Sequence, residues 1–232
     1  MGLWHVFYAD WQMECCGTPF AVGEEVSWPL LLLLTDADDF LGGGWDERLT
    51  HVVGPVREVS DGEGTVRVVG EDEGLVVALG DAGPREARQG DRIRAAGLLT
   101  VERHGGSWPE VTGRVRAVQV LTQGFAESAP GSRSWWPVPG ERSLRPVRSC
   151  PKWFAPGDVR TGADGRGRRR SEEGAVVTLE VFDVPPAPSE TPGTVSGADT
   201  AGTPRTVSGA DTAETPRTVS EADTADAGGQ PS

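Results

Sequence analysis

The chain has 232 residues, of which 35 are acidic and 22 are lysine or arginine, and its formal net charge is −13. An acidic chain is poorly suited to general binding of duplex DNA, which requires cations clustered against the phosphates. The longest purely aliphatic run, Leu30–Leu34, is far shorter than the roughly 20 residues of a membrane-spanning helix, so no membrane segment is expected.

Residues 3–9 begin the chain with aromatic and β-branched side chains, which predict a first strand. The stretch that follows, 11–28, is turn-rich and holds two tryptophans, a phenylalanine and two of the three cysteines. Gly17 and Pro19 favour a tight reversal within it. Because cysteines and large aromatic residues are usually buried or held in place, we expect this stretch to organise the rest of the chain.

A second strand is expected over 26–34, where Pro29 indicates an edge position or a bulge. The acidic and glycine-rich segment after this strand is typical of a loop, and residues 45–49 are long enough for one helical turn. The sequence therefore predicts an N-terminal strand-turn-strand hub over 1–49, with no other helix in the chain.

Residues 50–122 have a β pattern throughout, since short apolar runs alternate with turns of glycine, aspartate and glutamate. The expected strands are 52–59, 65–69, 75–79, 91–102 with a bend at Gly97, and 112–122, and residues 104–109 are expected to form a hairpin loop. Five runs of this kind predict a small closed or partly open barrel. An OB-like barrel is the first choice and an SH3-like barrel is the alternative.

Residues 123–172 lack a clear period and are predicted to form a long connection whose aromatic side chains pack back onto the barrel. Residues 173–184 contain a strong last strand, which we expect to pair with the N-terminal strand. The compact, mostly-β body is therefore expected to span residues 1–184.

The tail, 185–232, consists largely of three copies of a 12-residue repeat, at 191–202, 203–214 and 215–226. Each copy carries a single valine as its only large aliphatic residue and so cannot bury an apolar face. The tail is therefore predicted to be disordered.

Two segments carry a resemblance to a known family. The first is Trp-Gln-Met-Glu-Cys-Cys-Gly-Thr-Pro-Phe at 11–20, together with the Val-Gly-Glu and Val-Ser-Trp that follow it. The second is Ser-Cys-Pro-Lys-Trp-Phe at 149–154. With these segments the chain resembles a domain-of-unknown-function family of small proteins from high-GC (actinobacterial-type) bacteria. The resemblance covers residues 1–184 and implies a family without implying a mechanism.

The cysteines are candidate metal ligands. Cys15, Cys16 and Cys150, with His5, His51 or His104, offer three thiolates and an imidazole for tetrahedral zinc. However, neighbouring side chains on extended backbone point to opposite faces, and the spaced Cys-x-x-Cys pairs of zinc modules are absent. We therefore expect the cysteines to be small buried residues without a cofactor, and zinc is the alternative.

Cys15 or Cys16 with a histidine and Glu14 would also provide the parts of a thiol nucleophile. No recognisable signature surrounds either cysteine, and the pKa of a thiol cannot be read from sequence. Enzyme activity is therefore not predicted.

Aromatic residues interleave with cations between 108 and 153, and the hub and the aromatic 123–156 connection are expected to form a binding surface. The candidate binding residues are Trp11, Glu14, Trp28, Trp108, Trp135, Trp136, Arg148, Lys152 and Trp153. Exposed aromatic rings beside cations on an OB-like barrel stack single-stranded nucleic acid, but the same residues are suited to recognising a peptide or clamping the connection. The acidic body disfavours nucleic acid.

The expected function is a non-catalytic binding or interaction module with a protein or peptide partner. The alternatives are a metal- or thiol-dependent protein that uses Cys15, Cys16 and Cys150, and a single-stranded nucleic-acid binder. No basic flank followed by an apolar core is visible at the amino terminus, and three cysteines make no disulfide framework. We therefore expect a cytoplasmic protein with reduced thiols.

Overall fold

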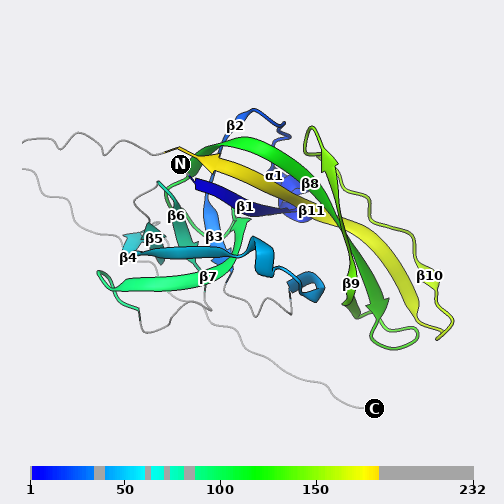
Figure 1. Ribbon diagram of the computed structural model, residues 1–232. Coiled ribbons are helices and arrows are strands. Elements are labelled where there is room, and N and C mark those ends of the chain that lie inside the picture. The colour runs from blue at the N-terminus through cyan, green and yellow to red at the C-terminus, as the bar shows by residue number, and fades with distance from the viewer. Residues whose placement is uncertain (1, 34–39, 61–63, 71–73, 81–86, 183–232) are drawn as a thin grey trace, which may run out of the picture. The chain divides into compact units, whose positions relative to one another are not determined.

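The computed structural model describes residues 2–33, 40–60, 64–70, 74–80 and 87–182 (Figure 1). The chain divides into a compact unit of residues 1–187 and a second unit, 188–232. The predicted disordered tail lies outside the described residues. In the described part of the chain, no helix has the length and apolar character needed to span a membrane.

The described residues form eleven strands, one α-helix and two 3-10 turns. In chain order these are β1 (Gly2–Ala9), α1 (Asp10–Cys16), β2 (Glu25–Trp28), β3 (Leu30–Leu33), η1 (Phe40–Gly42), η2 (Asp46–Arg48), β4 (Thr50–Ser60), β5 (Thr65–Gly70), β6 (Val76–Leu79), β7 (Arg92–Val101), β8 (Val111–Glu127), β9 (Trp135–Val147), β10 (Arg160–Thr161) and β11 (Gly167–Val181). The expectation of a mostly-β protein is confirmed.

The strands make one mixed sheet in the order β2-β8-β11-β1-β7-β3-β6-β5-β4, with β9 paired to β8 and β10 paired to β11. Strand β4 also pairs with β7, through residues 50–55 and 92–97. Strands β7, β3, β6, β5 and β4 therefore form a partial ring at one end of the sheet order. Gly97 lies where β7 passes from β4 to β3, and a Cβ there would come within 2.3 Å of the Leu33 carbonyl oxygen.

The predicted pairing of the last strand with the first is confirmed. Strand β1 runs antiparallel to β11 over its whole length, from Gly2 opposite Val181 to Ala9 opposite Gly174. On its other edge β1 runs parallel to β7. The N-terminal strand therefore lies in the interior of the sheet, which explains its apolar second half.

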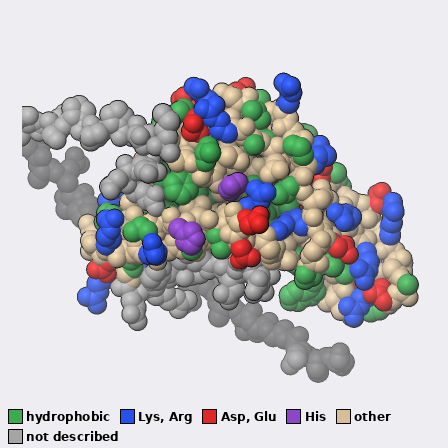
Figure 2. Space-filling model, in the orientation of Figure 1, with side chains coloured by type: hydrophobic (Ala, Val, Ile, Leu, Met, Phe, Trp, Pro, Cys, Tyr) green, Lys and Arg blue, Asp and Glu red, His purple; other side chains and the backbone are tan. Residues whose placement is uncertain are grey.

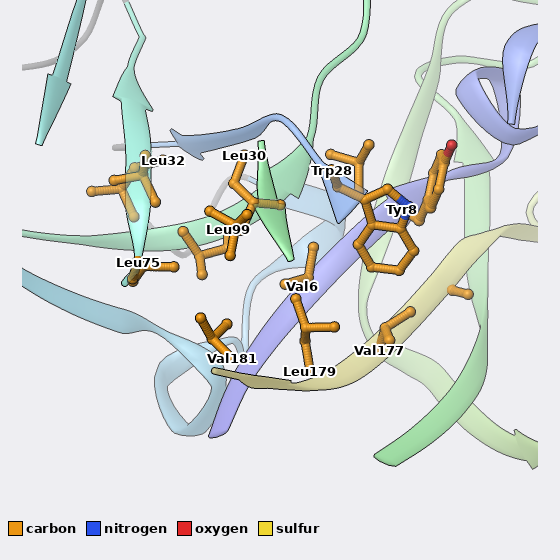
Figure 3. Packing of buried hydrophobic residues seen from close by; sticks show 14 of the residues in the cluster. Val6, Tyr8, Trp28, Leu30, Leu32, Leu75, Leu99, Val177, Leu179 and Val181 are labelled. Atoms are coloured by element: carbon orange, nitrogen blue, oxygen red, sulfur yellow. The ribbon is translucent and has the colours of Figure 1, made fainter. Parts of the chain in front are cut away.

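The main core lies where β1, β3, β7 and β11 bring their apolar side chains together (Figure 3). The labelled residues from these strands are Val6 and Tyr8, Leu30 and Leu32, Leu99, and Val177, Leu179 and Val181. Each of these side chains is almost completely buried, so the chain has the dense interior expected of a domain of this size without disulfides.

One predicted strand and one predicted hairpin differ from the structure. The strand expected over 26–34 is split at Pro29 into β2, which pairs with β8, and β3, which pairs with β6 and β7. Proline cannot donate to a ladder, so the break falls where the chain changes partner. The predicted hairpin at 104–109 is wrong, because β7 and β8 are not paired among the described strands.

The prediction of a long connection over 123–172 is also wrong in part. Residues 123–127 continue β8, and residues 135–147 form β9, which pairs antiparallel with β8. Residues 167–172 begin β11. This region lacks a simple period because proline, glycine and charged residues interrupt the apolar residues of β9, and the pairing of β8 with β9 contains a bulge.

Candidate metal centre

Helix α1 occupies the centre of the N-terminal hub, where the sequence predicted only turns. It has seven residues, too few to show a helical period, and its stability comes from contacts outside itself. The Gly17 N–H donates to the Gln12 and Met13 carbonyl oxygens at 2.9 and 3.1 Å. The Lys152 ammonium donates to the Met13 and Gly17 carbonyl oxygens at 2.6 and 3.0 Å, and so places a positive charge at the C-terminal end of the helix.

The buried side chain of Gln12 holds the segment after β7 against this helix. Its Nε2 donates to the Val101 carbonyl oxygen at 2.8 Å, and its Oε1 accepts from the Arg103 N–H at 3.0 Å. The Arg103 guanidinium donates to the Tyr8 hydroxyl at 3.2 Å. These contacts position His104 beside the end of α1, although 88 residues separate it from Cys16.

Two thiols and one imidazole meet at this point. The Sγ atoms of Cys15 and Cys16 lie 3.4 and 3.7 Å from Nε2 of His104, and the three ligand atoms all lie within 4.8 Å of one another. The expectation that adjacent cysteines point apart is wrong here because it assumed extended backbone. At the end of a helix, neighbouring side chains differ by about 100° and can both reach one group.

Glu102 and Trp11 hold the imidazole in place. One carboxylate oxygen of Glu102 accepts from the His104 and Gly105 N–H groups at 2.7 and 3.1 Å, and lies 3.9 Å from His104 Nδ1. The Trp11 ring centroid is 5.2 Å from that of His104. Because the carboxylate lies on the Nδ1 side, Nε2 faces the thiols, as is usual for a metal-ligating histidine.

Some surroundings of Cys16 raise the pKa of its thiol and others lower it. Burial raises the pKa of the Cys16 thiol, and the adjacent Cys15 raises this pKa further, whereas the positive charges of Arg103 and Lys152 lower it. Further positive charge beside Cys16, such as that of a bound cation, would favour its thiolate.

A family model described as "Family of unknown function (DUF6578)" matches residues 2–181. The chain belongs to this family. No curated protein and no solved structure matches the chain. The resemblance inferred from residues 11–28 and 149–154 is thereby confirmed for the family, and its expected extent of 1–184 agrees with the matched residues.

In this member of the family, Cys150 is separate from the cluster. Its side chain is 2% exposed, and burial raises the pKa of its thiol to about 12. The interpretation of the cysteines as buried core residues therefore holds for Cys150 and is wrong for Cys15 and Cys16, which are exposed.

This difference predicts selective thiol labelling. Treating the reduced, metal-free protein with iodoacetamide at neutral pH should modify Cys15 and Cys16 and spare Cys150, because a buried thiol with so high a pKa yields almost no thiolate. Peptide mass analysis before and after denaturation measures the sites. Rapid labelling of Cys150 in the native protein would contradict the described burial.

The other predicted binding residues are divided between core and surface. Trp28 and Trp108 are buried, and Trp108 Nε1 donates to the Leu30 carbonyl oxygen at 3.0 Å, so neither forms a binding surface. Trp11, Trp136 and Trp153 are 52%, 65% and 69% exposed, and Arg148 is also exposed. The Trp135 ring lies 5.1 Å from the Arg169 guanidinium. The Glu14 carboxylate accepts from the Phe154 N–H at 3.2 Å.

Lys152 contacts helix α1, which contains Glu14, whereas Trp135 and Trp136 lie on β9. Trp135 contacts Arg169, which lines a hollow of about 370 Å³ together with Glu141, Asp158, Arg160, Arg168 and Arg170. Figure 2 shows positive and negative side chains mixed over this end of the sheet. Arg168 pairs with both Glu141 and Asp164. A single-stranded nucleic-acid surface there stays a prediction.

Sequence reasoning missed Gln12 and Glu102. Gln12 lies three residues before Cys15, within the segment that carried the family resemblance, and is nearly fully buried. A glutamate two residues before a histidine in a glycine-rich loop was the available signal for Glu102.

Proposed function

We propose that this protein is a non-catalytic binding module that holds a zinc-type divalent cation at Cys15, Cys16 and His104. The observation that carries the proposal is the convergence of two thiols and one imidazole nitrogen within 4.8 Å, from segments of the chain about ninety residues apart. Thiolate and imidazole are the donors that zinc prefers in proteins.

The spacing of the ligand atoms fits a tetrahedral ion. Zinc–sulfur bonds of about 2.3 Å and zinc–nitrogen bonds of about 2.05 Å at the tetrahedral angle place sulfur and nitrogen about 3.6 Å apart. The two sulfur–nitrogen distances, 3.4 and 3.7 Å, lie on either side of this value. The two sulfur atoms lie within 4.8 Å of each other, against the roughly 3.8 Å that a tetrahedral ion requires.

The test is the zinc content of the reduced, full-length protein after dialysis. One zinc per chain is expected, and Cys15→Ser, Cys16→Ser or His104→Ala should each lower the affinity by more than the roughly 10–100-fold that outer-shell changes cause. His51→Ala is the matched control, since His51 is an exposed histidine on β4 outside the cluster. Zinc well below one per chain, or full zinc retained in the Cys15/Cys16 double variant, would overturn the proposal.

We also propose that the partial ring is an OB-like barrel. Strands β4, β5 and β6 form an antiparallel meander, β6 pairs in parallel with β3, and β7 pairs with both β3 and β4. Five strands joined by a non-sequential pairing are typical of the Greek-key OB topology. An SH3-like barrel is the alternative.

A cytoplasmic location is part of the same proposal. Exposed thiols such as Cys15 and Cys16 persist in a reducing compartment, where they are available to a metal.

A protein or peptide partner is proposed for the side of the molecule where Trp11 and Trp153 are exposed. Their segments contact each other through Lys152 and Glu14, and exposed aromatic rings are typical of such an interface.

A further inference from the structure

We propose that the cation is held by three protein ligands and that its fourth coordination position takes an anionic donor from outside the chain, such as the thiolate of a small thiol. The inference rests on the proposed function, because it needs the cation at Cys15, Cys16 and His104. It goes further by assigning the site an exchangeable ligand and the chemical class of that ligand.

The first argument is that the nearest side chains are already engaged. Within the described ranges, no fourth cysteine, histidine or carboxylate belongs to the cluster. Both carboxylate oxygens of Glu102 are used, one by the His104 and Gly105 N–H groups and the other by Gln12. The Glu14 carboxylate accepts from the Phe154 N–H. A fourth ligand from Glu102 would break contacts that hold the site together, and Glu14 does not belong to the cluster.

The second argument is that the three ligands are at the surface. Cys15, Cys16 and His104 are all exposed, and the His104 side chain retains 47% of its accessible area. Structural zinc sites are closed by four protein ligands, whereas sites with three protein ligands leave one position for water or another small ligand. A cation placed between these three atoms therefore has one side open to solvent.

The third argument concerns charge. Two thiolates cancel the two positive charges of the cation, so the loaded centre is neutral. Arg103 and Lys152 are close enough to Cys16 to act on its electrostatics, and neither makes an ion pair that the described residues show. The Glu102 carboxylate, 3.9 Å from His104 Nδ1, offsets part of this positive charge. A neutral loaded centre does not repel an anionic donor, and zinc-type cations readily take thiolate as a ligand.

The experiment uses the full-length protein loaded with Co²⁺ in place of zinc, because cobalt visible absorption bands report the coordination geometry and the ligands. Sodium azide is the first probe and β-mercaptoethanol is the second. We expect tetrahedral bands on loading and a saturable change in them with each probe, while metal content stays at one per chain. A shift with azide alone would identify a small-anion site and remove the assignment to thiolates.

The two proposals fail in different ways in this experiment. Absence of tetrahedral cobalt bands would overturn the proposed function itself. Tetrahedral bands that do not change with either probe would leave the metal site in place and overturn the open position, because the chain would then supply the fourth ligand.

A variant tests the charge argument separately. When Arg103→Gln is loaded to the same cobalt content as the unchanged protein, azide binding should be weaker by roughly threefold to fivefold, as expected for one charge removed at a partly solvated distance. Arg133→Gln, which removes an exposed arginine from the turn between β8 and β9, is the control and should not change azide binding. Equal azide affinity in all three proteins would contradict the role of Arg103.

Discussion

Replacing Trp28 with alanine is expected to lower the free energy of unfolding by about 3–5 kcal/mol, the usual cost of removing a large aromatic side chain from a core. Trp28 is 3% exposed. Its ring meets Tyr8 edge-on at a centroid distance of 5.4 Å and Phe20 at 4.9 Å. Truncation leaves a cavity between two rings held by different segments, so the surroundings cannot close over it.

Denaturant unfolding monitored by circular dichroism would measure this loss. Trp153→Ala is the matched control, because its ring is 69% exposed and its removal should change stability by less than about 0.5 kcal/mol. If Trp28→Ala unfolded at the same denaturant concentration as Trp153→Ala, the described packing of Trp28 would be wrong.

Replacing Gly174 with alanine should cost a similar amount, roughly 3–5 kcal/mol, by a different mechanism. Gly174 has a φ of +133°, and a Cβ there would lie 2.2 Å from the Tyr8 carbonyl oxygen and 3.0 Å from both Ala9 Cα and Asp10 N. The backbone strain contributes about 1–3 kcal/mol and the forced separation of β11 from β1 contributes about as much again.

Two other glycines separate these contributions in the same unfolding experiment. Gly131 has a φ of +73° with nothing within 4 Å of its Cβ position, so Gly131→Ala measures the conformational cost alone, about 1 kcal/mol. Gly80 has no neighbour nearer than 3.7 Å, and Gly80→Ala should be nearly neutral. A loss for Gly174→Ala no larger than that for Gly131→Ala would show that β11 and β1 tolerate a side chain between them.

The fold class and several strands could be predicted from sequence because alternation and β-branched runs are local properties. Pro29 indicated an interruption at the right place. A proline cannot show, however, that the first half of the run pairs with β8 and the second half with β7. The hairpin at 104–109 was a reasonable inference from a glycine-rich turn between two strands. The hairpin does not form because β8 pairs with β2 and β11 and not with β7. A local sequence pattern does not show which of several strands will pair with β8.

The candidate site was predictable only in its composition. Cys15, Cys16 and His104 were all considered as ligands, yet the argument against them depended on extended backbone at 15–16. A seven-residue helix capped by Lys152, which lies far along the chain, cannot be inferred from local propensity. The tryptophans show the same limit, since nothing local distinguishes the buried Trp108 from the exposed Trp136.

The interior position of β1 has a consequence for how the chain folds as it is made. Residues 2–9 leave the ribosome well before their antiparallel partner, 174–181. The centre of the sheet therefore cannot close until almost the whole family region has emerged, and until then the edge of β1 that pairs with β11 has unpaired backbone. Pairing between such distant segments makes folding slow and leaves the nascent chain open to association with other chains.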